Sequence, residues 1–319
     1  MTMRQVKRVH LLVLGAVTAL TVTACGGGDS GSGEDLSGPV VIDGSSTVEP
    51  LSAAAGELFM EKNSGVRVTV GTSGTGGGFK KFCNGETDIS DASRPIKDSE
   101  KQQCSGNGIN YSQIQVANDA LTVVVHKDNT WAKCLTVAQL KKIWEPNSTV
   151  KNWSEVDPSF PNEPLTLYGA GADSGTFDYF TEAINGKEGD TRTDYNPSED
   201  DNITVQGVAG AKGAMGYFGF SYFEENAAKL RAVEIDGGSG CVAPSVQAAQ
   251  DNTYKPLARP LFIYVSDRGV KKPQVEKFVE FYIDNNTEIV EAAQFVPMTS
   301  AQISDARADL ADIKDKAGQ

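Results

Sequence analysis

The chain has 319 residues and a formal net charge of −13, from 29 lysine and arginine against 42 aspartate and glutamate side chains. Nucleic-acid binding relies on clustered basic side chains that neutralise phosphates, so this charge balance argues against nucleic acid as a partner. The length is sufficient for two lobes of ordinary domain size, each with its own hydrophobic core.

The N-terminus has the pattern of an export signal. Arg4, Lys7 and Arg8 precede an apolar stretch over residues 11–22, which is too short to cross a bilayer. The run that ends at Cys25 resembles a bacterial lipobox, which implies cleavage before this cysteine and attachment of lipid, such as palmitate, to it. The open alternative is ordinary cleavage that leaves a free Cys25 thiol. Residues 1–24 are therefore expected to be a lipoprotein signal peptide.

Glycine, serine and acidic side chains dominate the segment from Cys25 to residue 38. This composition is typical of a flexible tether. We therefore expect residues 25–38 to connect a lipid anchor to the folded protein, on the outer face of the cell membrane.

Beyond the tether, apolar runs that suit strands alternate with runs of helical periodicity. The expected strands cover residues 40–42, 66–70, 114–116, 121–125, 165–168, 215–218 and 261–265. The expected helices cover residues 48–59, 79–83, 137–144, 177–184 and 275–293. Strands that alternate with helices in this way predict an α/β fold.

Three turns between an expected strand and an expected helix are rich in glycine and hydroxyl groups. They are Gly44-Ser45-Ser46-Thr47, residues 73–78 and Asp173-Ser174-Gly175-Thr176. At such a turn, free backbone N–H groups and hydroxyls point at one place, with the positive end of the helix dipole behind them. A fourth segment, residues 88–95, adds the guanidinium of Arg94. One positive charge among many neutral donors predicts a site for a single small oxyanion.

Each of these groups also has a purely structural interpretation. Ser46, Thr47 and Ser174 could serve only as helix caps, because serine and threonine cap helices throughout proteins. Arg94 could be an ordinary ion-pair partner, with Asp91 as the nearest acid. The presence of three similar turns in one chain favours the anion site.

The cysteines that remain after Cys25 are four in number, which in an exported protein predicts two disulfides with three open pairings. The pairing that we favour is Cys83 with Cys104 and Cys134 with Cys241. A metal site is the alternative use of these cysteines. It is disfavoured because no C-x-x-C spacing occurs and the only histidines are His10 and His126.

Four segments, in their order and spacing, are similar to the phosphate-binding protein of the high-affinity phosphate ABC transporter. They are residues 43–48, 73–79, 88–95 and 168–177. The resemblance covers nearly all of the mature chain. It implies a type II periplasmic-binding-protein fold, in which two α/β lobes are joined by two crossover hinges and hold the ligand in the cleft between them. The implied lobes are residues 39–124 with 261–319, and residues 125–260.

The same resemblance implies which residues hold phosphate. Thr47 would bind through its hydroxyl group, Val48 through its backbone N–H, and Thr75 would donate from the second turn. The Ser-Gly-Thr at residues 174–176 matches that of the family directly. The full expected set is Ser46, Thr47, Val48, Ser73, Thr75, Asp91, Ser93, Arg94, Ser174, Gly175 and Thr176.

The chain departs from the family pattern at two positions. Ala170 stands where many members have an arginine, and we expect Arg94 to replace that arginine from the other lobe. Ser93 stands where many members have an aspartate, which accepts the phosphate proton and repels fully ionised sulfate. Asp91 is the nearest candidate for this role. The further candidates are Asp43, Asp119 and Asp173.

We therefore expect an extracytoplasmic lipoprotein that captures inorganic phosphate and delivers it to the permease of an ABC importer, whose ATPase is a separate subunit. The expected protein is a monomer, uses no cofactor or metal, and is not an enzyme. One alternative is a receptor for another tetrahedral oxyanion, such as sulfate, molybdate or a phosphonate. A second is a secreted serine hydrolase around Ser174, for which His126 would be the only base in the mature chain.

Overall fold

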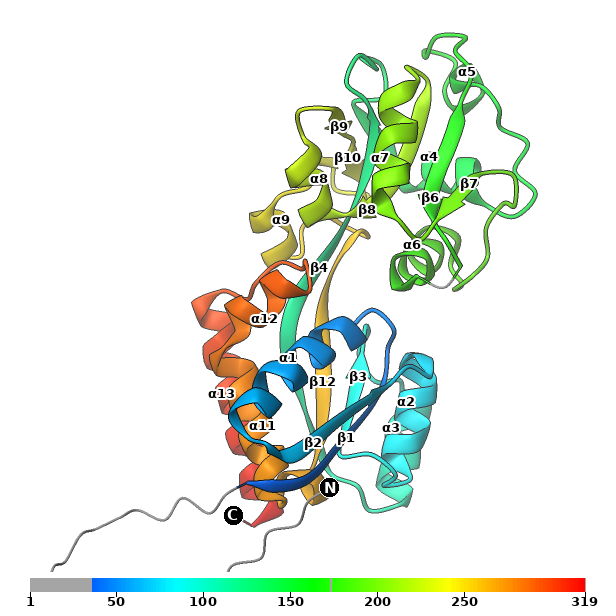
Figure 1. Cartoon of the computed structure of the whole chain (residues 1–319). Coiled ribbons are helices and arrows are strands. Elements are labelled where there is room, and N and C mark those ends of the chain that lie inside the picture. Colours follow the sequence, from blue (N-terminus) through cyan, green and yellow to red (C-terminus); the bar gives the residue numbers. More distant parts are fainter. Residues whose placement is uncertain (1–35, 173, 319) are drawn as a thin grey trace, which may run out of the picture. The chain divides into compact units, whose positions relative to one another are not determined.

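The structure of the protein is a computed structural model that describes residues 36–172 and 174–318. The expected signal peptide, Cys25 and most of the tether lie outside these residues, as does Asp173. In the described part, strands and helices alternate in two lobes, and the long strands β4 (Tyr111–His126) and β12 (Ala258–Ser266) run from one lobe towards the other (Figure 1). The expected α/β fold is confirmed. Within the described residues, no helix combines the length and the apolar character that a membrane span requires.

The sheet of lobe 1 has the strand order β2-β1-β3-β12-β4. β1 (Ser37–Gly44) pairs in parallel with β2 (Gly65–Gly71) and with β3 (Ile89–Ala92), whereas β12 runs antiparallel to β3 and β4. Because β1, β2 and β3 are parallel, their carboxyl ends meet at one edge of the sheet. The first two glycine-rich turns and the segment after β3 therefore lie together at that edge.

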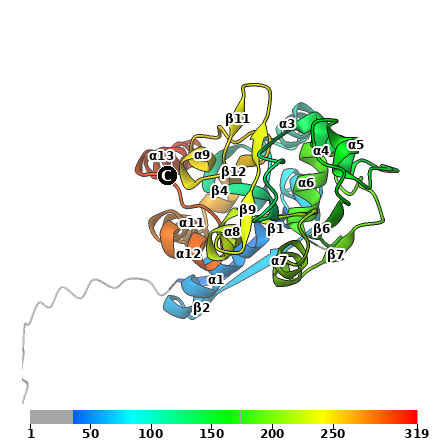
Figure 2. The same ribbon diagram turned by 90° about the horizontal axis from the view of Figure 1, so that it is seen from above.

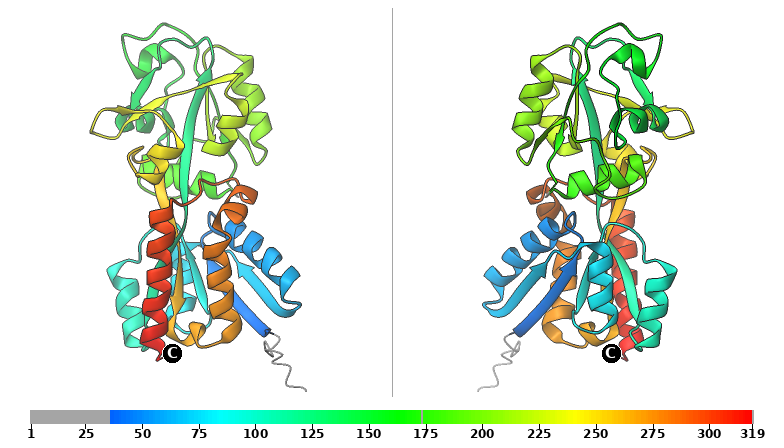
Figure 3. Two further views of the ribbon diagram at one scale, coloured as in Figure 1. Left: turned by 90° about the vertical axis from the view of Figure 1, so that its left-hand side faces the viewer. Right: turned by 90° about the vertical axis from the view of Figure 1, so that its right-hand side faces the viewer.

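Helices cover both faces of this sheet, and the alternation along β12 shows how. Leu261, Ile263 and Val265 lie in one core, whereas Phe262 and Tyr264 lie in a second core on the opposite face. The first core includes α1 (Glu49–Lys62), α11 (Pro273–Asp284), α12 (Asn286–Ala292) and α13 (Ser300–Ala317), and the second includes α2 (Gly74–Cys83) and α3 (Asp98–Gly106). Figure 3 shows α11 and α13 side by side along the strands. The short helix α10 (Asp267–Val270) follows β12 directly.

β4 changes its partner where it leaves lobe 1. Up to Ala120 it pairs with β12, and from Leu121 it pairs with β8 (Ala214–Gly219). The prediction of two separate strands, at residues 114–116 and 121–125, was therefore wrong. The polar residues between them interrupt the apolar pattern without interrupting the strand, because the neighbouring strands satisfy its backbone on both sides of the change.

The same change of lobe occurs on β12. Ala258 packs in the core of lobe 2, whereas Leu261 packs in the core of lobe 1. On β4, the change of pairing places the passage between the lobes at Ala120 and Leu121. On β12, the change of core places it between Ala258 and Leu261. The lobe boundaries expected from the sequence were residues 124 and 260. The chain therefore passes between the two cores at two neighbouring positions of the paired strands β4 and β12.

Lobe 2 has two smaller sheets. The first continues from β4 through β8 to β6 (Thr166–Ala170) and β7 (Asn196–Ser198), with β9 (Leu230–Ala232) also paired to β4. The second consists of β11 (Cys241–Val242), β10 (Glu234–Asp236) and β5 (Cys134–Thr136), and the β10–β11 hairpin projects from the lobe in Figures 2 and 3. The helices of this lobe are α4 (Val137–Trp144), α5 (Trp153–Val156), α6 (Gly175–Asn185), α7 (Asp201–Gly210), α8 (Phe220–Asn226) and α9 (Val246–Gln250).

Each lobe contains one disulfide, and both have the favoured pairing. Cys83–Cys104 joins α2 to α3, and Cys134–Cys241 joins β5 to the projecting hairpin. Among the described residues, the one group with metal-ligand spacing consists of Cys134, Glu234 and Cys241. Its two sulfur atoms are joined to each other, so they offer no thiolate to a metal.

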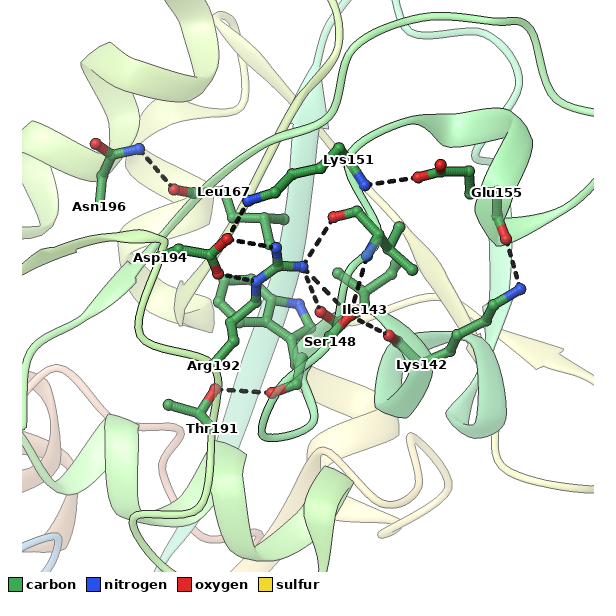
Figure 4. Close-up of polar contacts among 12 residues, drawn as sticks. Lys142, Ile143, Ser148, Lys151, Glu155, Leu167, Thr191, Arg192, Asp194 and Asn196 are labelled. Carbon is green, nitrogen blue, oxygen red and sulfur yellow. Dashed lines mark hydrogen bonds and ion pairs between the residues drawn. The ribbon is translucent and has the colours of Figure 1, made fainter.

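A buried arginine fixes the segment before β7 in lobe 2 (Figure 4). Arg192 is 2% exposed, and it donates to the carbonyl oxygens of Ile143 at 2.9 Å and Val150 at 3.0 Å. It also binds both carboxylate oxygens of Asp194, at 2.6 and 3.0 Å, and Lys151 binds the same carboxylate. These two cations hold the pKa of Asp194 well below its usual range. The cluster therefore ties the chain between α6 and β7 to α4, in a purely structural role.

The C-terminal helices differ from the expectation. The expected helix over residues 275–293 is two helices, α11 and α12, because the backbone of Asn285 leaves the helical region, with φ −105° and ψ 23°. α13 was not predicted, although its buried side chains recur at the spacing of one helix face. They are Ala306, Leu310, Ile313 and Ala317. Its start also carries a signal, because Thr299 and Gln302 form a capping box.

Candidate functional site

The first turn, between β1 and α1, is fixed by hydrogen bonds to β3. Gly44 has a φ of 154°, and a Cβ atom there would lie 2.1 Å from the carbonyl oxygen of Asp91, so only glycine fits. The N–H of Ser45 donates to that same carbonyl at 3.0 Å. The N–H of Val48 donates to the carbonyl oxygen of Ser45 at 3.2 Å. The predicted donor at Val48 is therefore already engaged within the turn.

The second turn contributes Thr75 rather than Ser73 to the cleft. Ser73 donates from its N–H and its hydroxyl group to the carboxylate of Asp43, which also binds Lys81. Thr75 Oγ1 lies 3.0 Å from Oγ of Ser93 and accepts the N–H of Ser93 at 3.3 Å. Two of the expected hydroxyl groups, from Thr75 and Ser93, are thus brought together at the carboxyl edge of the lobe 1 sheet.

Arg259, on β12 beside the lobe boundary, is the arginine that reaches this edge. Its Nη2 donates to Oγ1 of Thr47 at 3.1 Å, and its Nη1 donates to the carbonyl oxygen of Ser93 at 3.2 Å. Its Nε forms an ion pair with Asp119 at 3.2 Å. The guanidinium also lies over the ring of Tyr179 in lobe 2, at 3.4 Å from the ring centre. Arg259 therefore contacts both lobes.

The Arg259–Asp119 pair is largely removed from solvent. The two side chains are 12% and 5% exposed, and the residues are register partners on the neighbouring strands β12 and β4. Burial raises the pKa of Asp119, although the charge of Arg259 opposes this shift. Sequence reasoning missed Arg259 because no motif surrounds it. A signal existed, since Asp119 and Arg259 each stand two residues before an expected apolar strand, at residues 121–125 and 261–265.

Arg94, which was expected to replace the arginine missing at Ala170, is paired with an acidic side chain of its own lobe. Its Nη1 and Nη2 donate to the two carboxylate oxygens of Glu100, at 2.9 and 2.8 Å. Glu100 is close to Arg94 in sequence and is held in place by the N–H of Lys97 at 2.7 Å, as part of the cap of α3. This fixed carboxylate makes a charge-assisted contact with the guanidinium, and Arg94 lines neither of the two cavities at the contact between the lobes.

Asp91 also fails to reach the cleft. Its side chain is fully buried, and its Oδ1 accepts the hydroxyl of Ser52 on α1 at 2.8 Å. Burial raises the pKa of Asp91 to about 7. The expectation that Asp91 accepts a proton from phosphate does not fit this position. Of the further candidates, Asp43 and Asp119 are paired with cations, and Asp173 lies outside the described residues.

The third turn brings lobe 2 into contact with the first turn. Oγ of Ser174 accepts the N–H of Thr176 at 3.1 Å and so caps α6. The carbonyl oxygen of Gly175 accepts the hydroxyl of Thr47 at 3.3 Å. A Cβ atom at Gly175 would lie 2.9 Å from the Cα of Thr47, so a larger residue would push the lobes apart at this point.

Two cavities lie next to this contact between the lobes. The smaller is lined by Ser45, Ser46, Thr47, Gly74, Thr75, Ser93, Asp178, Tyr179, Glu188 and Arg259. The larger has a volume of about 220 Å³, and its lining includes residues 174–176. Ser46 and Thr47 line both cavities. The expected phosphate-binding residues are therefore divided between the two cavities. Thr75 and Ser93 line the smaller cavity, and the Ser-Gly-Thr of lobe 2 lines the larger.

The smaller cavity also has two acidic side chains that sequence reasoning missed. Oδ2 of Asp178 accepts the hydroxyl of Ser46 at 3.3 Å, and Glu188 lies in the same lining. Burial raises the pKa of both carboxyl groups. Asp178 follows Ser174 by four residues, so the two side chains lie on one face at the start of α6. This spacing from an expected binding residue could have identified Asp178 as a candidate.

The residues of a serine hydrolase are not assembled in the described part of the chain. Nδ1 of His126 accepts the N–H of Asp128 at 3.1 Å, and His126 lines neither cavity of the cleft. The hydroxyl of Ser174 caps a helix. A nucleophilic serine needs a base within hydrogen-bond reach, and among the described residues none contacts the hydroxyl of Ser174.

Comparison with known proteins assigns the chain to a family. A family model described as a PBP superfamily domain matches residues 29–286. Protein SphX of Synechococcus elongatus is 53% identical over 262 residues, which are 81% of this chain and 77% of that protein. The phosphate-binding protein PstS of Staphylococcus saprophyticus is 39% identical over 300 residues, which are 92% of this chain and 91% of that protein.

A solved structure agrees with these matches. A possible phosphate binding protein from Planctomyces limnophilus has a TM-score of 0.84 and 47% identity, over 88% of this chain and 99% of that chain. The expected type II periplasmic-binding-protein fold is confirmed. Proteins of this kind bind solutes outside the cytoplasm and are not enzymes. The chain therefore belongs to the PBP superfamily, in the family of phosphate-binding proteins that includes PstS.

Proposed function

We propose that the protein binds inorganic phosphate in the cleft between its lobes. The observation that carries this proposal is Arg259, a guanidinium fixed by Asp119 beside the hydroxyl groups of Thr47, Thr75 and Ser93. One charged donor among several neutral donors suits a small oxyanion, because charge-assisted hydrogen bonds supply affinity and the hydroxyls supply geometry. The phosphate-binding relatives support the same ligand.

Both lobes contribute to binding in this proposal. Thr47 donates to the carbonyl of Gly175 directly, and phosphate would replace that hydrogen bond by accepting from Thr47 and from N–H groups at the start of α6. A ligand that contacts both lobes favours their closed arrangement, which a transporter can then recognise. The proposed binding residues are Ser46, Thr47, Thr75, Ser93, Ser174, Gly175, Thr176 and Arg259.

Asp178 is the proposed acceptor for the proton that phosphate carries at neutral pH. It lines the smaller cavity and accepts a hydrogen bond from Ser46, so its carboxylate faces the proposed ligand. Fully ionised sulfate has no proton to donate and would be repelled by this charge. The same role was expected of Asp91, which is buried away from the cleft.

The wider role that we propose is delivery of phosphate to the permease subunits of an ABC importer, with ATP hydrolysis in a separate subunit. The protein would act as a monomer outside the cytoplasm, held to the membrane by lipid on Cys25. The lipobox-like sequence that ends at Cys25 supports this anchor. Cys25 itself lies outside the residues that the structure describes.

Isothermal titration calorimetry of protein stripped of ligand tests the proposal directly. We expect saturable binding of phosphate and no heat of binding with sulfate at the same concentration. Mass spectrometry under native conditions then shows one phosphate per chain. Equal binding of sulfate would contradict the selectivity assigned to Asp178, and absence of phosphate binding would contradict the function itself. Turnover of a phosphate ester would favour an enzyme instead.

A further inference from the structure

The larger cavity of the cleft has more space than a phosphate ion needs. Its volume is about 220 Å³. Since one water molecule takes about 30 Å³ in the liquid, the cavity has room for about seven water-sized groups. It also shares Ser46 and Thr47 with the smaller cavity, and its lining includes the Ser-Gly-Thr at residues 174–176. A phosphoryl group held by these residues would therefore face additional open space.

The other walls of this cavity are largely apolar and come from both lobes. The larger apolar side chains in the lining are Pro50, Phe295 and Val296 from lobe 1 and Leu121, Phe220 and the ring of Tyr222 from lobe 2. Walls of this kind favour the carbon chain of a ligand, because they remove its surface from water. They offer nothing to a second small oxyanion.

One acidic side chain in this lining has no partner among the described residues. The carboxylate of Asp201, at the start of α7, makes no hydrogen bond or ion pair with any residue in the described ranges. Burial, together with the nearby Asp200 and Glu199, raises the pKa of Asp201 to about 6. The carboxylate is therefore charged at about pH 8, and a nearby cation would stabilise this charged form.

We infer that the larger cavity receives the substituent of an organic phosphoryl compound, a short carbon chain that ends in an amino group. The inference rests on the proposed function, because the phosphoryl group would use the phosphate-binding residues. The chain would pack against the apolar walls, and the ammonium group would pair with Asp201. Both aminoalkyl phosphonates and aminoalkyl phosphate monoesters have this chemistry.

Two substitutions separate this ligand class from phosphate. Asp201→Asn removes the charge that would bind the ammonium group. Gly219→Leu fills the cavity, because Gly219 lies in its lining, has an extended backbone with φ −61° and ψ 145°, and has no atom within 4 Å of an added Cβ. Neither residue belongs to the proposed phosphate-binding set. The phosphate affinity of each variant therefore serves as the control for its affinity for the organic compounds.

The test is calorimetry of the wild type and both variants with phosphate, 2-aminoethylphosphonate, phosphoethanolamine and ethylphosphonate. We expect the wild type to bind the two amino compounds about tenfold more tightly than ethylphosphonate. This is the difference in affinity that one partly buried ion pair supplies. Asp201→Asn should remove that difference, and Gly219→Leu should abolish binding of all three organic compounds. Both variants should bind phosphate as the wild type does.

Each other outcome has a definite meaning. Phosphate binding without binding of either amino compound overturns this inference and leaves the proposed function intact. Binding of an amino compound without phosphate supports the inference and overturns the proposed function, whereas binding of neither overturns both. If only one amino compound binds, the result identifies the source as a phosphonate or as an ester. Tight binding of the amino compounds that Gly219→Leu leaves unchanged also overturns the inference, because the substituent then lies elsewhere.

Discussion

Two aspartate–arginine combinations lie near the cleft, and they are built in opposite ways. Asp91 and Arg94 are neighbours in sequence, yet Asp91 binds Ser52 in the core and Arg94 binds Glu100. Asp119 and Arg259 are 140 residues apart, yet they form one buried ion pair beside the hydroxyl groups of the cleft. A charged residue within a sequence motif can thus be paired inside its own lobe, while a charged residue outside any motif can lie beside the hydroxyl groups of the cleft.

The buried Asp91 gives the largest expected effect on stability. Its pKa is raised from 3.8 to about 7, so between these pH values the folded state holds a proton that the unfolded chain has lost. The free energy of unfolding therefore falls as the pH rises from about 4 to about 7, by up to about 4 kcal/mol at about 1.4 kcal/mol per pKa unit. Urea unfolding over this pH range should show the slope in the wild type and a much smaller slope in Asp91→Asn. Equal slopes would mean that Asp91 is already ionised in the fold.

The Asp119–Arg259 pair should show the next largest effect. Asp119→Asn leaves a buried guanidinium without its ion-pair partner, which lowers the free energy of unfolding by about 3 kcal/mol. Thermal unfolding measures the loss. The matched control is Asp128→Asn, whose side chain is 68% exposed and which should unfold as the wild type does. The same midpoint for Asp119→Asn and wild type would show that Arg259 does not depend on Asp119.

Arg259→Ala should weaken phosphate binding by about 2 kcal/mol or more, which is about 30-fold, because a charge-assisted contact with the ligand is lost. Arg259→Lys should have an intermediate affinity, since lysine keeps the charge but lacks the planar fork of donors. Calorimetric titration with phosphate gives both values. Wild-type affinity in Arg259→Ala would remove Arg259 from the site.

Arg94→Ala should have the smallest effect. Arg94 lies outside the smaller cavity, and phosphate affinity should change less than about twofold, while the partly exposed ion pair contributes at most about 1 kcal/mol to stability. The same titration, run beside Arg259→Ala, measures the difference between the two arginines. A larger loss of affinity for Arg94→Ala than for Arg259→Ala would reverse the comparison.

The fold could be predicted well where local patterns decide it. The alternating valines of β2 and the helical spacing of α1 reflect one buried face each, so both elements were predicted. The continuity of β4 could not be predicted, because the residues around Asn118 are satisfied by partners far away in sequence, including Val296. Long-range pairing of this kind leaves no local signal.

In the candidate site, too, the residues fixed by local sequence could be predicted and those placed by long-range packing could not. The hydroxyl-rich turns were predictable, since the sequence of each turn determines its own backbone. Arg259 and Asp178 were missed because their approach to Thr47 and Ser46 depends on long-range packing. Arg259 is placed by the pairing of β12 within the lobe 1 sheet, and Asp178 by the position of α6 against lobe 1. Arg94 was assigned to the ligand because the sequence does not reveal that Glu100 folds back onto it.

The most direct test of the central claim is a crystal structure of the protein with phosphate. We expect phosphate oxygens within hydrogen-bond distance of the Arg259 guanidinium, of the hydroxyl groups of Thr75 and Ser93, and of the start of α6. We also expect the ion pair between Arg94 and Glu100 to remain. A phosphate bound by Arg94, with Glu100 displaced and Arg259 still bonded only to protein, would contradict the central claim.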